Sequence, residues 1–165
     1  MLNFEKKPGR AAIAIFFIRF AITMVFGDKR HHPDEYYQGQ EMAYQIAYQD
    51  VVPFQKTWEW LPQYALRSVI YPFFLSIPMQ IFRALNIDSN FLVVNSVFFM
   101  NSIIFAAGDV FLYKLANNLL GSRGAKIALI YNLFNFKITE VFHKTLTNGA
   151  EANLAIISLY FYSKL

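Results

Sequence analysis

The sequence predicts an all-α membrane protein with several helical spans. Of its 165 residues, 56% are hydrophobic and 16% are charged, and the mean hydropathy is +0.30. Its long apolar runs lack the polar residue every three or four positions that marks a helix on the surface of a soluble domain. A soluble helical domain with a large core is the competing class, and the unbroken apolar runs argue against it.

Charge and cysteine content exclude further classes. The net charge is +4, but the 15 Lys and Arg residues are scattered between apolar runs instead of forming one basic stripe, so a nucleic-acid partner is not expected. The chain has no cysteine, which excludes disulfides and thiolate metal sites.

Four spans are predicted, at about residues 11–27, 91–112, 125–142 and 150–162. Each is near or below the roughly 20 apolar residues that a bilayer core requires. Lys and Arg residues precede the first span, which places the N-terminus in the cytoplasm. A cleaved signal peptide is the alternative, but "MVFGDKRHH" offers no small-x-small cleavage site, so a retained anchor is favoured.

The apolar segment at residues 68–85 is ambiguous because it contains two prolines, which interrupt a helix. If it spans, Lys114, Arg123 and Lys126 lie on the opposite side of the membrane from the N-terminus; if it does not, they lie in the cytoplasm. The bias of Lys and Arg toward cytoplasmic loops favours a segment that does not span. Residues 28–90 then form one structured loop on the lumenal or outer face.

That loop is predicted to carry an amphipathic helix, "DEYYQGQEMAYQIAYQ", which rests on the membrane surface. Helical spacing places polar and apolar residues on opposite sides, the polar set being Asp34, Gln38, Glu41 and Gln45 and the apolar set Met42, Ala43, Ile46 and Ala47. Pro33 suits a first helical turn, where the helix dipole favours the carboxylates of Asp34 and Glu35. Helix capping alone and a functional role are both open for these two residues on this pattern.

Several short strings follow in a recognisable order: "HPDEYYQ", "TWEW", "RS" before "YP", and "TLTN" followed by Glu. In these strings the chain resembles the dolichyl-phosphate-mannose-dependent mannosyltransferases of the endoplasmic reticulum, in glycosyltransferase family 22 of the GT-C superfamily. Within that family it is most similar to the enzymes that add the third, α-1,2-linked mannose to glycosylphosphatidylinositol (GPI). The resemblance runs from about His32 to Tyr162.

The resemblance implies a multi-span helical GT-C module in the endoplasmic reticulum membrane, with its catalytic loop in the lumen. It implies a lipid-linked sugar donor, dolichyl-phosphate mannose, a GPI glycolipid acceptor, and no metal or other cofactor. Related enzymes that add the fourth GPI mannose, or mannose to the lipid-linked N-glycan precursor, are alternatives. A non-catalytic membrane subunit or degenerate copy is another, although the intact "HPDE" favours an enzyme.

Candidate catalytic residues follow from the reaction that the resemblance implies. A β-linked donor and an α-linked product require inversion, and the acceptor hydroxyl needs a general base. By match to the family this base is Asp34, with Glu35 in reserve. The leaving phosphate needs cations, and Arg67 and Lys144 are the candidates.

The "TWEW" string supplies candidate substrate-binding residues. The aromatic and acidic side chains of "TWEW" either bind sugar or form an aromatic belt at the membrane interface, and they are Trp58, Glu59 and Trp60. His31 and His32 beside the two carboxylates are an alternative metal site, disfavoured because adjacent histidines rarely point at one ion.

Two ionisable residues, Asp109 and Glu151, lie in or beside predicted spans, where a charged group is costly and usually has a partner. Arg19 in the first span either is such a partner or extends to the interface. A functional role and helix packing are both open for all three.

The sequence departs from the family pattern in two ways. Lys144 stands where the family has Arg before "TLTN", which keeps the charge but loses bidentate phosphate geometry. Members of the superfamily have several hundred residues and more spans, so the chain is predicted to be an N-terminal portion. Its final Ser-Lys-Leu matches a peroxisomal signal, but the end of a span is the simpler interpretation.

Overall fold

The structure is a computed structural model of the whole chain, and it describes residues 7–26, 33–49, 56–64, 66–135 and 145–165. The regular structure in these ranges is entirely helical. The longer helices are α1 (Pro8–Phe26), α3 (Glu41–Tyr48), α4 (Ile70–Ala84), α5 (Asn90–Phe134) and α7 (Thr147–Tyr162). Short α2 (Pro33–Glu35), the π-helix η1 (Tyr36–Gln40) and the 3₁₀ turn η2 (Trp58–Trp60) complete the described elements.

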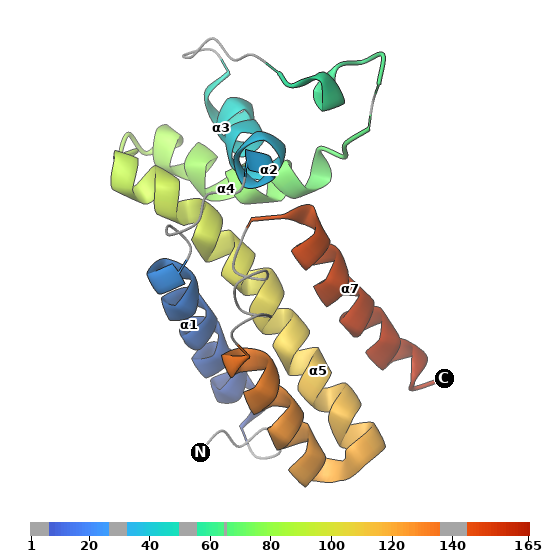
Figure 1. Cartoon of the computed structure of the whole chain (residues 1–165). Coiled ribbons are helices and arrows are strands. Elements are labelled where there is room, and N and C mark those ends of the chain that lie inside the picture. The colour runs from blue at the N-terminus through green and yellow to red at the C-terminus, as the bar shows by residue number, and fades with distance from the viewer. Residues whose placement is uncertain (1–6, 27–32, 50–55, 65, 136–144) are drawn as a thin grey trace.

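Helices α1, α5 and α7 form an elongated bundle, and α2, α3 and α4 gather at one end of it (Figure 1). The N-terminus of α1 points to the other end. Helix α4 lies across the bundle instead of along it, and with 15 residues it is shorter than a typical span.

Helix α5 reverses direction at Gly121 and so supplies two antiparallel arms, residues 90–120 and residues 122–134 (Figure 1). Gly121 has φ 74° and ψ 176°, a conformation that is open essentially only to glycine. Ser89 begins the helix, because its hydroxyl oxygen accepts a hydrogen bond from the Leu92 N–H at 3.4 Å. The predicted spans at 91–112 and 125–142 fall on these two arms, although residues 136–142 lie outside the described ranges.

Two described helices, α1 and α5, are long and apolar enough to cross a membrane. Together with the apolar composition, this agrees with the predicted all-α membrane class. Many large apolar side chains remain exposed along the bundle, among them Ile13, Phe17, Leu154 and Phe161. In a bilayer, such side chains are suited to face lipid or other helices.

The buried core has two parts. One lies among α3, α4 and the start of α5, and it includes Ala43, Leu75, Met79 and Val97. The other lies between α1 and the two arms of α5, around Ile15. The apolar side of α3 is therefore covered by α4 inside the protein, whereas contact with a membrane surface was predicted for it.

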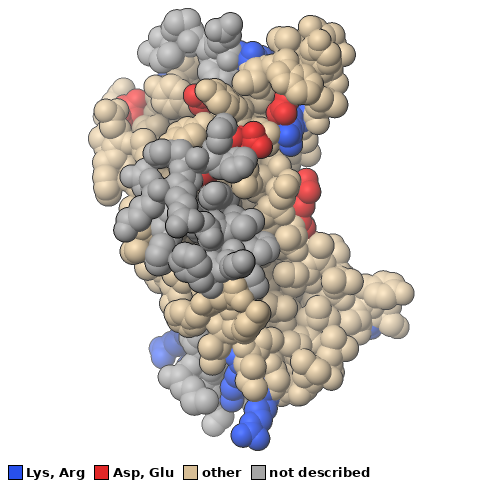
Figure 2. Space-filling view, in the orientation of Figure 1, with Lys and Arg blue, Asp and Glu red and all other residues tan. Residues whose placement is uncertain are grey.

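Charged side chains lie mainly toward the two ends of the bundle. On the face in Figure 2, Lys and Arg side chains mark the end near the N-terminus, whereas carboxylates lie together with further basic side chains toward the α2–α4 end. A cavity of about 460 Å³ joins Pro8 of α1, Lys114 and Asn118 of α5, and Tyr160 of α7. The start of α1 and Lys114 therefore lie at the same end of the molecule.

Candidate functional site

The "HPDE" turn places its two carboxylates in different surroundings. Asp34 is exposed, whereas Glu35 is buried, with only 2% of its surface exposed. Both belong to the short helix α2, which begins at Pro33. Because successive residues in a helix point about 100° apart, one carboxylate faces the protein interior and the other faces outward.

Glu35 is bound to Thr145, the first residue of "TLTN", 110 positions later in the chain. Its Oε1 accepts a hydrogen bond from the Thr145 backbone N–H at 2.9 Å and another from the Thr145 hydroxyl at 3.1 Å. Thr145 is itself buried, with 1% exposed. Both the acid and the threonine are thus held in place by buried, charge-assisted bonds.

Two residues of the π-helix complete the contact with Thr145. The Gln40 side-chain amide donates to the Thr145 hydroxyl oxygen at 3.0 Å and to Glu35 Oε1 at 3.3 Å. Gly39 leaves room for the Thr145 backbone, since a Cβ at this position would lie 2.7 Å from the Thr145 carbonyl oxygen. We call Glu35, Gly39 and Gln40 the Thr145 clamp.

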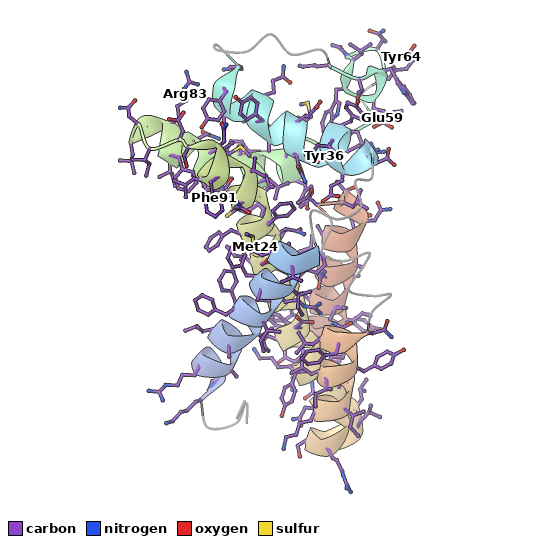
Figure 3. All side chains as sticks on the ribbon, turned by 60° about the vertical axis from the view of Figure 1, so that its left-hand side comes forward. Met24, Tyr36, Glu59, Tyr64, Arg83 and Phe91 are labelled. Atoms are coloured by element: carbon purple, nitrogen blue, oxygen red, sulfur yellow. The ribbon has the colours of Figure 1, made fainter. Side chains whose placement is uncertain are left out.

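The "TWEW" turn packs beside the same region, and Figure 3 shows Glu59 and Tyr64 in the loop near Tyr36. Glu59 accepts two hydrogen bonds from Arg67, from Nε at 3.1 Å and from Nη2 at 3.3 Å. The Trp60 indole N–H donates to the Tyr37 carbonyl at 3.1 Å, which ties the turn to the π-helix. Glu59 and Arg67, both predicted to bind substrate, are therefore paired with each other.

Trp58 differs from its neighbours because its side chain projects outward. It is 57% exposed, and its ring meets the edge of Tyr64 at a centroid distance of 5.5 Å. This geometry suits stacking against a sugar and suits an aromatic belt equally well.

Tyr71 of the "YP" string connects α4 to the first arm of α5. Its hydroxyl donates to Asn101 Oδ1 at 2.9 Å. Burial raises the pKa of Tyr71 above its usual value, and the negative charge of Glu35 raises it further. The neutral phenol is therefore the form present at physiological pH, where it can donate this bond.

The remaining predicted site residues are Glu151, Lys144, His31 and His32. Glu151 is exposed on α7. Lys144, His31 and His32 lie outside the described residues, although Lys144 directly precedes Thr145 in the sequence.

Asp109 has a buried partner, Arg19, which is one of the two roles that the sequence left open for this arginine. Arg19 of α1 donates to both oxygens of the Asp109 carboxylate, at 2.5 Å and 2.7 Å, and the Asn132 side chain donates to the same carboxylate at 2.7 Å. This cluster joins α1 to both arms of α5, inside the bundle.

Sequence reasoning missed Gly39, Gln40 and Thr145 as site residues. All three lie within or next to the strings that carried the resemblance, "HPDEYYQ" and "TLTN". The signal was therefore present, but nothing in the sequence indicated that the two strings contact each other.

Comparisons with known proteins found similarity to mannosyltransferases. A mannosyltransferase of Arabidopsis thaliana, APTG1, is 28% identical over 131 residues, covering 79% of this chain and 23% of that protein. GPI alpha-1,2-mannosyltransferase 3 of Homo sapiens is 30% identical over 130 residues, covering 79% and 23%. GPI mannosyltransferase 3 of Schizosaccharomyces pombe is 29% identical over 132 residues, covering 79% and 25%.

The chain spans about a quarter of the length of these curated relatives. No solved structure matches it. The model of the Alg9-like mannosyltransferase family matches residues 12–165, which is nearly the whole chain. The chain belongs to the Alg9-like mannosyltransferase family.

Proposed function

We propose that this chain is the N-terminal part of a mannosyltransferase that moves mannose from dolichyl-phosphate mannose to a GPI precursor, as the third, α-1,2-linked residue. The family match supports the transferase class. The names of the human and fission yeast relatives support the GPI acceptor. The observation that carries the proposal is the exposed Asp34 beside the buried Glu35, whose Oε1 is hydrogen-bonded to Thr145, at the end where the family strings meet.

The proposed orientation places the N-terminus and Gly121 in the cytoplasm and the α2–α4 end in the lumen of the endoplasmic reticulum. Three observations support it: the basic residues near the N-terminus, the common position of Pro8 and Lys114, and the crosswise course of α4. In this orientation, residues 68–85 do not span, and Asp34 faces the compartment in which the lipid-linked substrates are presented.

The proposed reaction is a single displacement with inversion. An acceptor hydroxyl oxygen forms a bond to C1 of mannose while the bond from C1 to the phosphate oxygen breaks, and the β-linked donor becomes an α-linked product. The hydroxyl proton passes to the Asp34 carboxylate, and dolichyl phosphate leaves with its electron pair. An exposed carboxylate is accessible to a hydroxyl, which must approach to about 2.6–3.2 Å.

Cations are proposed to stabilise the leaving phosphate. Arg67 lies at the correct end, and its guanidinium has five N–H donors, of which those at Nε and Nη2 bind Glu59. Lys144 is the second proposed cation, because it directly precedes the clamped Thr145 in the sequence. Electrostatic stabilisation by such groups requires no acid on the leaving oxygen.

The test uses the complete protein in cells that lack their own third-mannose enzyme, with GPI intermediates followed by mass. The wild-type protein should convert the two-mannose lipid to the three-mannose lipid. Asp34→Asn should lower transfer by about 10²- to 10⁴-fold while membrane insertion is retained. Asp88→Asn is the matched control, since Asp88 is also an exposed aspartate and lies just before α5, which begins at Asn90.

Other outcomes would redirect the proposal. A four-mannose GPI lipid or an extended N-glycan precursor would identify one of the related enzymes. Insertion without any transfer by the wild-type protein would favour a non-catalytic membrane subunit. Near-normal transfer by Asp34→Asn would move the general base to another carboxylate.

A further inference from the structure

We propose that Glu35 is a positioning residue and not a second base: through the Thr145 clamp it fixes Asp34 relative to the "TLTN" segment. This inference rests on the proposed function, and it goes further by assigning Glu35, Gly39, Gln40 and Thr145 a shared role. The family strings "HPDEYYQ" and "TLTN" then have a physical reason to occur together.

The hydrogen bonds of Glu35 leave it poorly suited to be a base. Two donors of Thr145 and the amide of Gln40 converge on one oxygen, Oε1, within 2.9–3.3 Å. The residue is also 2% exposed, so a substrate hydroxyl would have to displace buried partners to reach it. A buried carboxylate with such hydrogen bonds is suited to hold the Thr145 segment in a fixed orientation.

The π-helix explains how the clamp residues come to face Thr145 together. In this element, bonds run from residue i to residue i+5, and the Glu41 N–H indeed donates to the Tyr36 carbonyl. The same wide turn places Gln40 over Glu35, with Nε2 and Oε1 at 3.3 Å. In a regular α-helix, Gln40 would face away from Glu35. The π-helix is therefore what allows this contact.

Gly39 makes the close approach of the two segments possible. An added Cβ would lie 2.7 Å from the Thr145 carbonyl oxygen, and this neighbour is backbone that cannot rotate away. Gly39→Ala should therefore push the "TLTN" segment from the π-helix without removing any polar group. Gly9→Ala is the matched control, because a Cβ at Gly9 has no neighbour within 4 Å.

Asp34 depends on the clamp through the backbone. Its Cα is about 3.8 Å from that of Glu35, so movement of Glu35 carries Asp34 with it. Thr145 is likewise joined directly to Lys144, the proposed phosphate-binding cation. The clamp thus sets the distance between the base and the segment that serves the leaving group.

The first experiment measures transfer by the complete protein. Gly39→Ala and Thr145→Val should each lower kcat by about 10²-fold, the size expected of a displacement near 1 Å, with KM for the acceptor changed less than twofold. Thr145→Ser keeps the hydroxyl and should retain at least half of wild-type kcat. Glu35→Ala combined with Thr145→Val should be no worse than Glu35→Ala alone.

The second experiment needs no activity. Hydrogen exchange of the Thr145 amide is measured by mass spectrometry on the 165-residue chain in lipid nanodiscs. It should be slow in the wild-type chain and in Thr145→Ser, and at least tenfold faster in Glu35→Ala. Gly9→Ala should leave it unchanged.

The outcomes separate the two proposals. No mannose transfer by the wild-type protein, with Thr145 exchange as expected, would overturn the proposed function and leave the clamp as a structural contact only. The inference would be overturned if Asp34→Asn abolishes transfer while Thr145→Val transfers mannose as well as Thr145→Ser does. If Gly39→Ala does not insert, the comparison of the two Thr145 variants decides.

Discussion

Arg19 and Asp109 form a bidentate ion pair inside the helical bundle, with Arg19 4% exposed and Asp109 fully buried. Asn132 donates a further bond to the carboxylate, and its carbonyl accepts one from Arg19 at 3.3 Å. Three helical segments that are far apart in the sequence meet at this cluster. In a low-dielectric interior, each charge is tolerated only because the other is present.

Asp109→Asn should destabilise the chain strongly, by about 3–5 kcal/mol, because it leaves the Arg19 guanidinium buried without its counter-charge. Thermal unfolding of the detergent-solubilised chain measures the effect. Glu59→Gln is the control, since the Glu59–Arg67 pair is partly exposed, at 19% and 30%, and such pairs contribute only about 0–1 kcal/mol. Equal losses of stability in the two variants would show that burial does not increase the contribution of the Arg19–Asp109 pair to stability.

The helical class and the positions of the main helices followed from the sequence, because apolar runs and prolines act locally. The run at 11–27 became α1, and the runs at 91–112 and 125–142 fall on the two arms of α5. The charge of Asp109 inside a predicted span also indicated a partner. Of the two roles open for Arg19, the structure shows that it is this partner. A buried charge demands a counter-charge wherever it lies, so this inference needed no knowledge of the fold.

The different burial of Asp34 and Glu35 did not follow from the sequence. Both are acidic, adjacent and in the first turn of a helix, so pattern alone assigns them similar surroundings. Which one is buried depends on Thr145, 110 residues away. The π-helix was equally hidden, because the spacing of apolar residues in "YYQGQ" does not distinguish it from an α-helix.

Trp58→Ala should separate the two interpretations of the exposed indole. If Trp58 stacks on a sugar of the acceptor, the variant should raise KM for the acceptor by about tenfold with kcat unchanged, as expected when ground-state and transition-state binding are lost equally. If it belongs to an aromatic belt, kinetics should be unchanged and Trp58 fluorescence should respond to lipid-borne quenchers. Trp60→Phe is the comparison, because Trp60 donates its N–H to Tyr37 instead of projecting outward.

An N-glycosylation acceptor sequence engineered near Asp50 should be modified, whereas one near Gly121 should not. The prediction follows from the orientation in which α1 begins in the cytoplasm and α4 does not span. Gel mobility before and after treatment with an endoglycosidase measures the modification. Glycosylation near Gly121 would place that turn in the lumen and would require residues 68–85 to cross the membrane.

Residues 1–165 expressed alone should not transfer mannose. Transfer requires donor and acceptor to be held with their reacting atoms about 3–3.5 Å apart, and the chain spans only about a quarter of the length of the curated relatives it matches. Large apolar side chains on α7, such as Leu154 and Phe161, are also exposed where neighbouring helices of a longer protein would pack.

The chain alone is therefore expected to insert in the membrane without enclosing a lipid-linked donor next to Asp34. In cells that lack the third-mannose enzyme, the two-mannose GPI lipid should still accumulate when only residues 1–165 are expressed. The complete protein, expressed to the same level, is the positive control. Restored three-mannose lipid with residues 1–165 would contradict the prediction, because Asp34, the Thr145 clamp and these helices would then suffice to bind and align both lipids.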